Sequence, residues 1–242
     1  MSLILQAFDH FISTKLSPEE KKLKDRVSKI NPLYVNEDEK LDNLRFVVLD
    51  TETTGLNPNN GDRVISLGAV LIENGKIKEN KPFYELVNPN CSVPEDIVNL
   101  TGIRDDMVRN KPDFTNVLTR FLPLLENSVI VGHAVQFDLD FINRHLQRTC
   151  GKKLDCKSVD TQLLARYFLP ESNDFSLEGL CSLLDIKCES RHHALFDAIS
   201  TARLLKKLIE IIQKEGIHTV HDLESSIHCR QLLQMSSDAM NW

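Results

Sequence analysis

The central part of the chain alternates between short apolar runs and stretches whose apolar residues recur every three or four positions. Apolar runs bounded by polar turns predict buried strands, and the three-to-four spacing predicts helices packed on them. The Asn74-Gly75 pair between two apolar runs favours a hairpin. The predicted strands span 44–50, 63–73, 81–87, 128–132 and 157–160, and the predicted helices span 94–100, 104–109, 114–125, 136–148, 161–168, 177–184 and 194–212.

This order of elements predicts an α/β fold. The first three strands follow one another through short connections and are expected to form an antiparallel meander. The later strands alternate with helices, which predicts parallel neighbours joined by right-handed crossovers. We therefore expect a mixed five-stranded sheet with helices on both faces. Active sites of such sheets tend to lie at the carboxyl ends of the strands.

The two ends of the chain have a different pattern. Residues 1–43 predict a helical N-terminal extension that either supports the main domain or docks a partner. Within it, apolar residues at helical spacing predict a helix over 3–12, and Ser17-Pro18-Glu19-Glu20 is typical of a second helix start, with that helix ending near Ile30. Residues 31–41 predict a linker. The main domain is expected to span 44–215, followed by a C-terminal tail, 216–242, with a short helix and a fraying end.

Composition narrows the protein class without identifying a function. Of the 242 residues, 41% are hydrophobic and 26% are charged, as in soluble globular proteins. The net charge of −6 does not indicate a nucleic-acid binder. It does not exclude one either, because metal-ligand carboxylates count as negative charges until the metal ions bind. The N-terminal residues do not resemble a signal peptide, and no apolar run is long enough to span a membrane. We expect a cytoplasmic protein with reduced cysteines and no membrane partner.

Two acids stand at the end of the first predicted strand. Asp50 and Glu52 are separated by one residue, so their side chains point to the same face, with Cα atoms about 6.6–7 Å apart. That spacing suits carboxylates that hold two metal ions about 3.5–4 Å apart. The alternative interpretation is a strand that ends in an acidic turn, and this pair alone leaves both open.

Two later segments carry further candidate groups. Asp138 falls in the first turn of a helix that follows a strand and Gly132-His133, where it either joins a site or only offsets the helix dipole. Asp197 lies on a helix with alanines at small-residue spacing, which lets the helix lie close to the sheet. His192 is expected in the preceding loop, since it cannot share a helix face with Asp197. A histidine near a metal-bound water is a natural general base, whereas a His doublet alone is more typical of a solvated loop.

Together, three segments resemble a known family. The ordered set LDTETTGL, VGHAVQFD and HHALFDA resembles the three motifs of the DEDDh exonucleases, a family that includes the proofreading epsilon subunit of bacterial DNA polymerase III and ribonuclease T. The resemblance covers about residues 44–212. It implies an RNase H-like fold and two divalent cations, Mg²⁺ or Mn²⁺. It also implies that the metal-binding acids are Asp50, Glu52, Asp138 and Asp197. The general base that it implies is His192.

The resemblance also implies substrate contacts. The loop that holds the terminal nucleotide matches Thr53, Thr54, Gly55 and Leu56, and residues that wedge the terminal base and sugar match Leu100 and Thr101. His133 and Phe137 are further candidates, with a satisfied loop histidine and core packing as their respective alternatives. The chain departs from the family at Ala134, where many relatives have Asn.

The implied activity is metal-dependent hydrolysis that releases nucleoside 5′-monophosphates from the 3′ ends of DNA. Single-stranded or frayed 3′ ends are the expected substrate, DNA being favoured over RNA, and a polymerase or another protein is a possible partner in proofreading. One alternative is a ribonuclease that trims RNA or oligonucleotide 3′ ends, because no residue in the sequence decides recognition of the 2′-hydroxyl. Another is a catalytically silent nuclease-like binding module, which the complete set of acids disfavours.

Overall fold

The computed structural model describes residues 16–30, 36–188 and 192–239, with side chains up to residue 231. Its centre is a six-stranded mixed sheet in the order β3-β2-β1-β5-β6, with β4 beside β2 on the same edge as β3. β1 is antiparallel to β2 and parallel to β5, and β6 is parallel to β5. The strands are β1 (Phe46–Thr53), β2 (Val64–Glu73), β3 (Lys76–Ile77), β4 (Phe83–Leu86), β5 (Val129–Gly132) and β6 (Ser158–Asp160).

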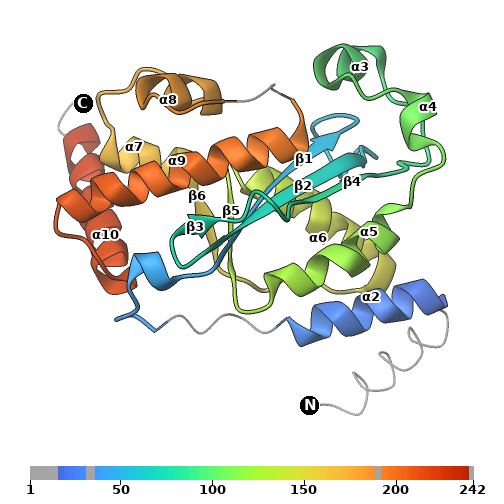
Figure 1. Ribbon diagram of the computed structural model, residues 1–242, viewed down its shortest axis with the longest axis horizontal. Helices are drawn as coiled ribbons and strands as arrows, with labels where there is room; N and C mark the ends of the chain where they lie inside the picture. The colour runs from blue at the N-terminus through green and yellow to red at the C-terminus, as the bar shows by residue number, and fades with distance from the viewer. Residues whose placement is uncertain (1–15, 31–35, 189–191, 240–242) are drawn as a thin grey trace.

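Helices cover both faces of the sheet, as predicted (Figure 1). Alternate residues of β1 divide between two cores: Val47 and Leu49 face one helical layer, and Phe46 and Val48 face the other. The first layer holds α2 (Pro18–Lys29), α5 (Phe114–Phe121) and α6 (Gln136–Cys150), and the second holds α7 (Thr161–Phe168), α8 (Leu177–Leu183), α9 (Ala194–Lys214) and α10 (Val220–Ala239). The short helices are α3 (Glu95–Thr101), α4 (Asp105–Val108), η1 (Leu41–Asn43) and η2 (Leu122–Leu125).

The predicted meander is confirmed with one addition. Asn74 and Gly75 both have positive φ, 51° and 66°, and form the tight turn expected of this dipeptide. The turn closes onto the two-residue strand β3, and β4 then joins the same edge of β2 further along. The sheet therefore has six strands where five were predicted, because a two-residue pairing leaves no apolar run in the sequence.

The predicted helix start at Ser17 is also present. Ser17 Oγ accepts from the Glu20 N–H, and the Glu20 carboxylate accepts from the Ser17 N–H, which forms a capping box at the start of α2. Leu23 and Val27 are buried in the core that α2 shares with α5 and α6. The helix predicted over 3–12 lies outside the described residues, and the division into an extension, a main domain and a tail stays a prediction.

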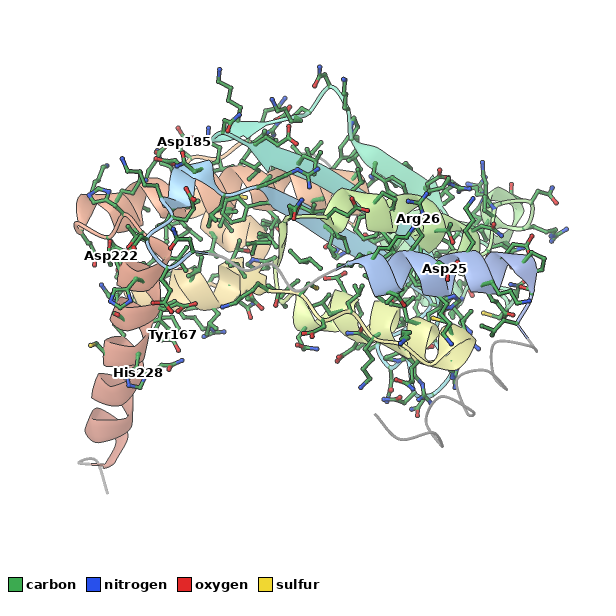
Figure 2. All side chains as sticks on the ribbon, turned by 90° about the horizontal axis from the view of Figure 1, so that it is seen from below. Asp25, Arg26, Tyr167, Asp185, Asp222 and His228 are labelled. Carbon is green, nitrogen blue, oxygen red and sulfur yellow. The ribbon has the colours of Figure 1, made fainter. Side chains whose placement is uncertain are left out.

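The prediction of a short C-terminal helix was wrong, because α10 has 20 residues. Figure 2 shows it running away from the body of the molecule. Arg230 fixes its middle by donating to the backbone carbonyl of Tyr167 at 2.7 Å and by lying 4.4 Å from the ring centroid of Phe168. These contacts come from a distant part of the sequence, and local propensity could not reveal them. Among the described residues, none of the helices is long and apolar enough to cross a membrane.

Candidate active site

The position of the site follows from a mismatch in strand length. β5 ends at Gly132 and pairs with β1 only from Phe46 to Val48, although β1 continues to Thr53. The last part of β1 therefore extends past the end of its parallel neighbour. Side chains from both helical layers can reach β1 through this opening, at the carboxyl end of the strand.

Three carboxylates meet at this end of the sheet. Asp50 and Glu52 lie on the face of β1 that α9 covers, and Asp197 approaches from the first turn of α9. Their ligand atoms all lie within 4.8 Å of one another, and Glu52 and Asp197 are buried. Hard divalent cations such as Mg²⁺ take oxygen ligands of this kind. The chemistry and convergence of these donors fit a divalent cation.

A glycine on β2 allows α9 to come so close. Gly68 pairs with Asp50 across the β1–β2 ladder, and a Cβ added to Gly68 would lie 2.3 Å from the backbone of Ala194 and Leu195. The predicted small-residue face of α9, which includes Ala194 and Ala198, is fully buried. This face of the helix was predicted from the sequence, whereas the glycine opposite it was not, since an isolated Gly in a strand indicates a close approach without indicating the partner.

Asp138 reaches the site from the opposite helical layer. It is the third residue of α6, and its Oδ1 accepts a 2.6 Å hydrogen bond from Thr51 Oγ1. Burial raises the pKa of this carboxyl well above its ordinary value, against the opposing effect of the Thr51 hydrogen bond. Asp138 lines the same cavity as the other acids but is not one of the three that converge within 4.8 Å. Thr51 was missed, although strand alternation places it on the face toward α6.

The two adjacent histidines have different surroundings. His192 lies in the loop before α9, has a positive φ of 57°, and lines the cavity with the acids. His193 precedes the helix, and its ring is stacked between Tyr84 and Phe196, with centroids 4.6 Å and 4.4 Å away. The His193 N–H also donates to Asp197 Oδ2 at 3.3 Å. The stacked ring thus fixes the start of α9 and leaves His192 as the member of this pair that lines the cavity.

The acids and His192 line one cavity of about 410 Å³. Two apolar side chains, Leu56 and Leu100, line it with 83% and 50% of their surface exposed, which leaves apolar surface free to contact a ligand. The other predicted substrate residues that line it are Thr53, Gly55, Thr101, His133 and Phe137, and residues that the sequence analysis missed are Thr51, Ile97, Gln162, Ser176 and Leu177.

Thr54 has a different position from its neighbours. It is buried and does not line this cavity. Its N–H donates to the carbonyl of Arg63 at 2.8 Å, and its Oγ1 accepts from the Arg63 N–H at 3.0 Å. These two bonds close the loop between β1 and β2, so the geometry supports a structural role for Thr54 in holding the loop that carries Gly55 and Leu56.

The segment after β5 is held by hydrogen bonds. His133 Nε2 donates to the carbonyl of Phe175 at 2.9 Å, and its Nδ1 lies 3.0 Å from Thr161 Oγ1. The N–H of Ala134 donates to Asp160 Oδ1, and Ala134 has a φ of 61°. Asn adopts this left-handed conformation more readily than Ala does. Having Ala where many relatives have Asn therefore costs backbone strain at this position.

Comparisons with known proteins agree with this geometry. A family model described as "Exonuclease" matches residues 47–205. The chain is 35% identical over 223 residues to "DNA polymerase III PolC-type" of Oceanobacillus iheyensis, covering 87% of this chain and 15% of that protein. It is 36% identical over 179 residues to "3'-5' exonuclease DinG" of Bacillus subtilis, covering 74% of this chain and 19% of that protein.

A solved structure shares the fold. "Exonuclease X in complex with 5' overhanging duplex DNA" superposes with a TM-score of 0.55 at 25% identity, covering 76% of this chain and 99% of that one. The predicted RNase H-like mixed sheet and the DEDDh-type motifs are thereby confirmed, and so, at the level of the family, is the enzyme class of 3′–5′ exonuclease. The chain belongs to the exonuclease family.

Proposed function

We propose that this protein removes nucleoside 5′-monophosphates from the 3′ ends of DNA. The observation that carries the proposal is the convergence of Asp50, Glu52 and Asp197 within 4.8 Å at the end of β1. His192 and Asp138 line the same cavity. This combination of clustered carboxylates with a histidine at the same opening suits phosphodiester hydrolysis, in which negative charge must be neutralised and a water must lose a proton.

In this proposal the four carboxylates hold two divalent cations, Mg²⁺ or Mn²⁺. Such cations, when bound, neutralise the charge of a phosphodiester and lower the pKa of water. Asp50, Glu52 and Asp197 supply the ligand atoms that already lie together. Asp138 supplies a fourth carboxylate from α6, and the bond from Thr51 Oγ1 holds it in orientation.

The remaining residues bind the strand and move the proton. His192 accepts the proton of the attacking water, and its place in a loop rather than on α9 allows the imidazole to approach a substrate. Leu56 and Leu100 contact the terminal base with their apolar surface, and Phe137 stacks on it, since a base stacked on an aromatic side chain gains about 1–3 kcal/mol. The apolar surface that Leu56 and Leu100 leave exposed supports this assignment.

The biological substrate and partner are further parts of the proposal. The chain spans 15% of the PolC-type relative and 19% of the DinG relative, so the activities of those whole proteins are not transferred to it. The name of the first relative supports DNA and an association with a polymerase during proofreading. We propose DNA 3′ ends over RNA 3′ ends, and a cytoplasmic location, on this basis.

The test uses oligonucleotides labelled at the 5′ end. DNA and RNA of the same sequence are incubated with the protein and Mg²⁺ or Mn²⁺, beside Asp50→Asn and a sample with chelator. A ladder that shortens from the 3′ end and is absent from both controls is the expected result, with DNA degraded faster. Faster degradation of RNA would replace DNA by RNA as the substrate, and no ladder on either strand would favour a silent binding module.

A further inference from the structure

A second cavity lies on the other side of the loop that borders the active site. It has a volume of about 420 Å³ and is formed by the end of this loop, the segment after β4, the start of α5 and one face of α6. Gly55 lines the active-site cavity, whereas Gly61 and Arg63 line the second one. The same loop thus contributes residues to both cavities, and nothing in the exonuclease chemistry proposed above uses the second.

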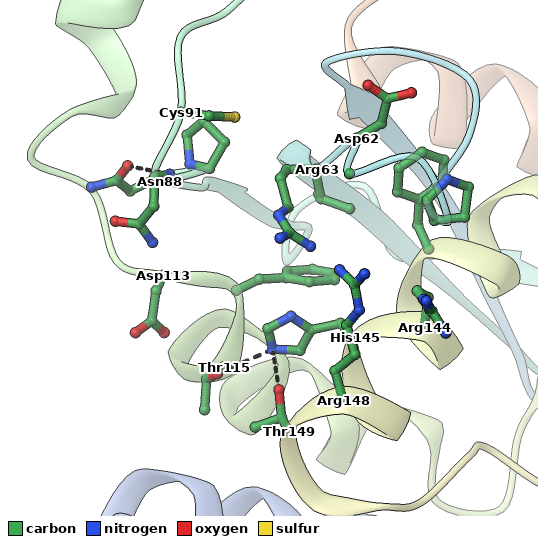
Figure 3. A pocket seen from close by; sticks show the side chains of 17 residues that line it. Asp62, Arg63, Asn88, Cys91, Asp113, Thr115, Arg144, His145, Arg148 and Thr149 are labelled. Carbon is green, nitrogen blue, oxygen red and sulfur yellow. Dashed lines mark hydrogen bonds between the residues drawn. The ribbon is translucent and has the colours of Figure 1, made fainter.

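Three arginines gather around this second cavity, which we call the arginine cavity. Figure 3 shows Arg63 entering it from the loop before β2 and Arg148 reaching toward Arg63 from α6, with Arg144 on the same helix. Within the part of the chain that the structure describes, no ion pair joins any of the three to a carboxylate. The Nε–H of Arg144 is buried and has no hydrogen-bond partner. A buried donor without a partner is costly unless a ligand supplies an acceptor.

The two acids of the arginine cavity, Asp62 and Asp113, form no ion pair with these guanidiniums. Asp113 Oδ1 accepts from the N–H of Asn116 and thereby caps α5, and Asp62 Oδ2 accepts from the N–H of Asn57. In Figure 3 both carboxylates point away from the Arg63 guanidinium. With three guanidiniums and two carboxylates among its lining residues, the cavity keeps a net positive charge.

The histidine on the floor of the cavity contributes no charge at neutral pH. Burial, and to a lesser extent the charges of Arg63 and Arg148, lowers the pKa of His145 to about 4 against the opposing effect of Asp113. His145 Nε2 lies 3.0 Å from Thr115 Oγ1 and 3.4 Å from Thr149 Oγ1. Because its pKa responds to charges in the cavity, His145 also serves as a local reporter of an anion bound there.

We propose that the arginine cavity binds a phosphate group, carried either by a nucleic-acid strand or by a small phosphate ester. Guanidinium groups are the side chains best suited to phosphate oxygens, because their planar donors bind two oxygens at once. A phosphate would separate the like charges of Arg63 and Arg148 and give the Arg144 Nε–H an acceptor. This site needs neither metal nor hydrolysis, so it goes beyond the proposed exonuclease activity.

The first experiment titrates the protein with inorganic phosphate in the presence of chelator. Binding is followed through the imidazole proton resonance of His145, identified by its absence in His145→Gln, and through the melting temperature. Arg144→Gln and Arg148→Gln are compared with Arg120→Gln, which removes an arginine that pairs with Glu85 outside the cavity. We expect saturable binding to the wild type and to Arg120→Gln, and affinity about tenfold weaker in the two cavity variants, the loss typical of a hydrogen bond to a charged group.

Two results would overturn the proposal. One is a His145 resonance that does not respond to phosphate in the folded wild type, and the other is equal affinity in all four proteins. Because the titration uses no metal and no hydrolysis, neither result depends on whether the protein is an exonuclease. Conversely, a protein without nuclease activity can still bind phosphate here.

The second experiment separates the two sources of phosphate. A fluorescent single-stranded oligonucleotide is bound to Asp50→Asn without metal, and its affinity is measured as a function of salt, with and without Arg148→Gln. A strand that reaches the cavity predicts a salt slope shallower by about 0.7 for the lost phosphate contact. An unchanged slope, together with the loss of inorganic phosphate binding, assigns the cavity to a small phosphate ester.

Discussion

The two cavities on either side of the 55–63 loop gather opposite charges. The active-site cavity brings carboxylates together, and the arginine cavity brings guanidiniums together. Burial acts in both: it raises the pKa of Asp138 in the first and lowers the pKa of His145 to about 4 in the second. In each case the neutral form is favoured. One loop thus separates a cavity lined by carboxylates from a cavity lined by guanidiniums.

The strongest test of the comparison removes one carboxylate from the acidic side. Asp50→Asn is expected to lower kcat by about 10³-fold or more, because a ligand of the divalent cations is lost. Without metal its melting temperature is expected to equal or exceed that of the wild type, since like charges repel less. Added Mn²⁺ should raise the melting temperature of the wild type only, as measured by calorimetry.

Asp140→Asn is the matched control, because Asp140 lies on α6 close to Asp138 and is exposed. It should keep full activity and the full response to Mn²⁺. Equal stabilisation of Asp50→Asn and the wild type by Mn²⁺ would mean that the acidic cavity is not the metal site.

The two histidines before α9 provide a second test. His192→Ala is expected to lower kcat by about 10²–10⁴-fold with little change in stability, as for a general base. His193→Ala should lower the melting temperature and reduce kcat less, because it removes the ring stacked between Tyr84 and Phe196. Single-turnover rates and thermal unfolding separate the two effects, and a larger loss of rate at His193 would reverse the assignment of the base.

A third test moves α9 away from the sheet without altering an acid. The methyl group of Gly68→Ala would lie 2.3 Å from the backbone of Ala194, so the helix start must shift. We expect a loss of about 1–3 kcal/mol in the free energy of unfolding and about 10²-fold in kcat from displacement of Asp197. Gly75→Ala is the control for a loss of stability without displacement of α9: its φ of 66° makes alanine costly, but a Cβ there meets open space, so kcat should stay unchanged. Full activity of Gly68→Ala would show that Asp197 need not be held so closely.

On the basic side, His145 predicts a dependence of stability on pH. Its pKa is about 4 in the folded chain, whereas an exposed imidazole has a pKa of about 6.5. Between these values the unfolded chain binds a proton that the folded chain does not, so stability is lost as pH falls from about 6.5 to 4. The loss reaches about 3 kcal/mol, at about 1.4 kcal/mol per pKa unit. Urea unfolding of His145→Gln should lack this component, and an unchanged pH profile would contradict the buried position of the ring.

The smallest expected effect concerns the turn after β5. Ala134 has a φ of 61°, which costs about 1–2 kcal/mol for a residue with a Cβ. Ala134→Gly removes that cost but gives the unfolded chain more freedom, by about 0.4–1 kcal/mol. We expect a net gain of a few tenths of a kcal/mol up to about 1 kcal/mol in unfolding free energy. Chemical denaturation measures it, and a loss of stability would show that Ala134 makes a packing contact worth more than the strain.

Local patterns in the sequence predicted most of the elements and the acidic residues. α7 spans the predicted residues 161–168, and the Ser17 capping signal marks the true start of α2. What the sequence did not reveal depends on contacts between distant segments. The hydrogen bond from Thr51 to Asp138, the approach of α9 to Gly68 and the anchoring of α10 by Arg230 each join residues that only the folded sheet brings together.

The arginine cavity escaped sequence analysis for a similar reason. Arg144 and Arg148 recur at helical spacing on α6, a pattern that is usually a solvated face, and Arg63 comes from a loop more than 80 residues earlier. Only the packing of that loop against α5 and α6 turns three ordinary surface residues into one cluster.

The short length of β5 has a consequence for how an enzyme of this fold can lose its activity. β5 ends at Gly132, so the last residues of β1 have no parallel neighbour on that side and Thr51 can meet Asp138 of α6 there. An insertion that let β5 continue beside Asp50 would add ladder hydrogen bonds and close the opening. The protein would gain stability and lose its catalytic surface with every acid still in place. Inactive descendants of this fold are therefore to be sought among chains with a longer fifth strand, as well as among those that lack a carboxylate.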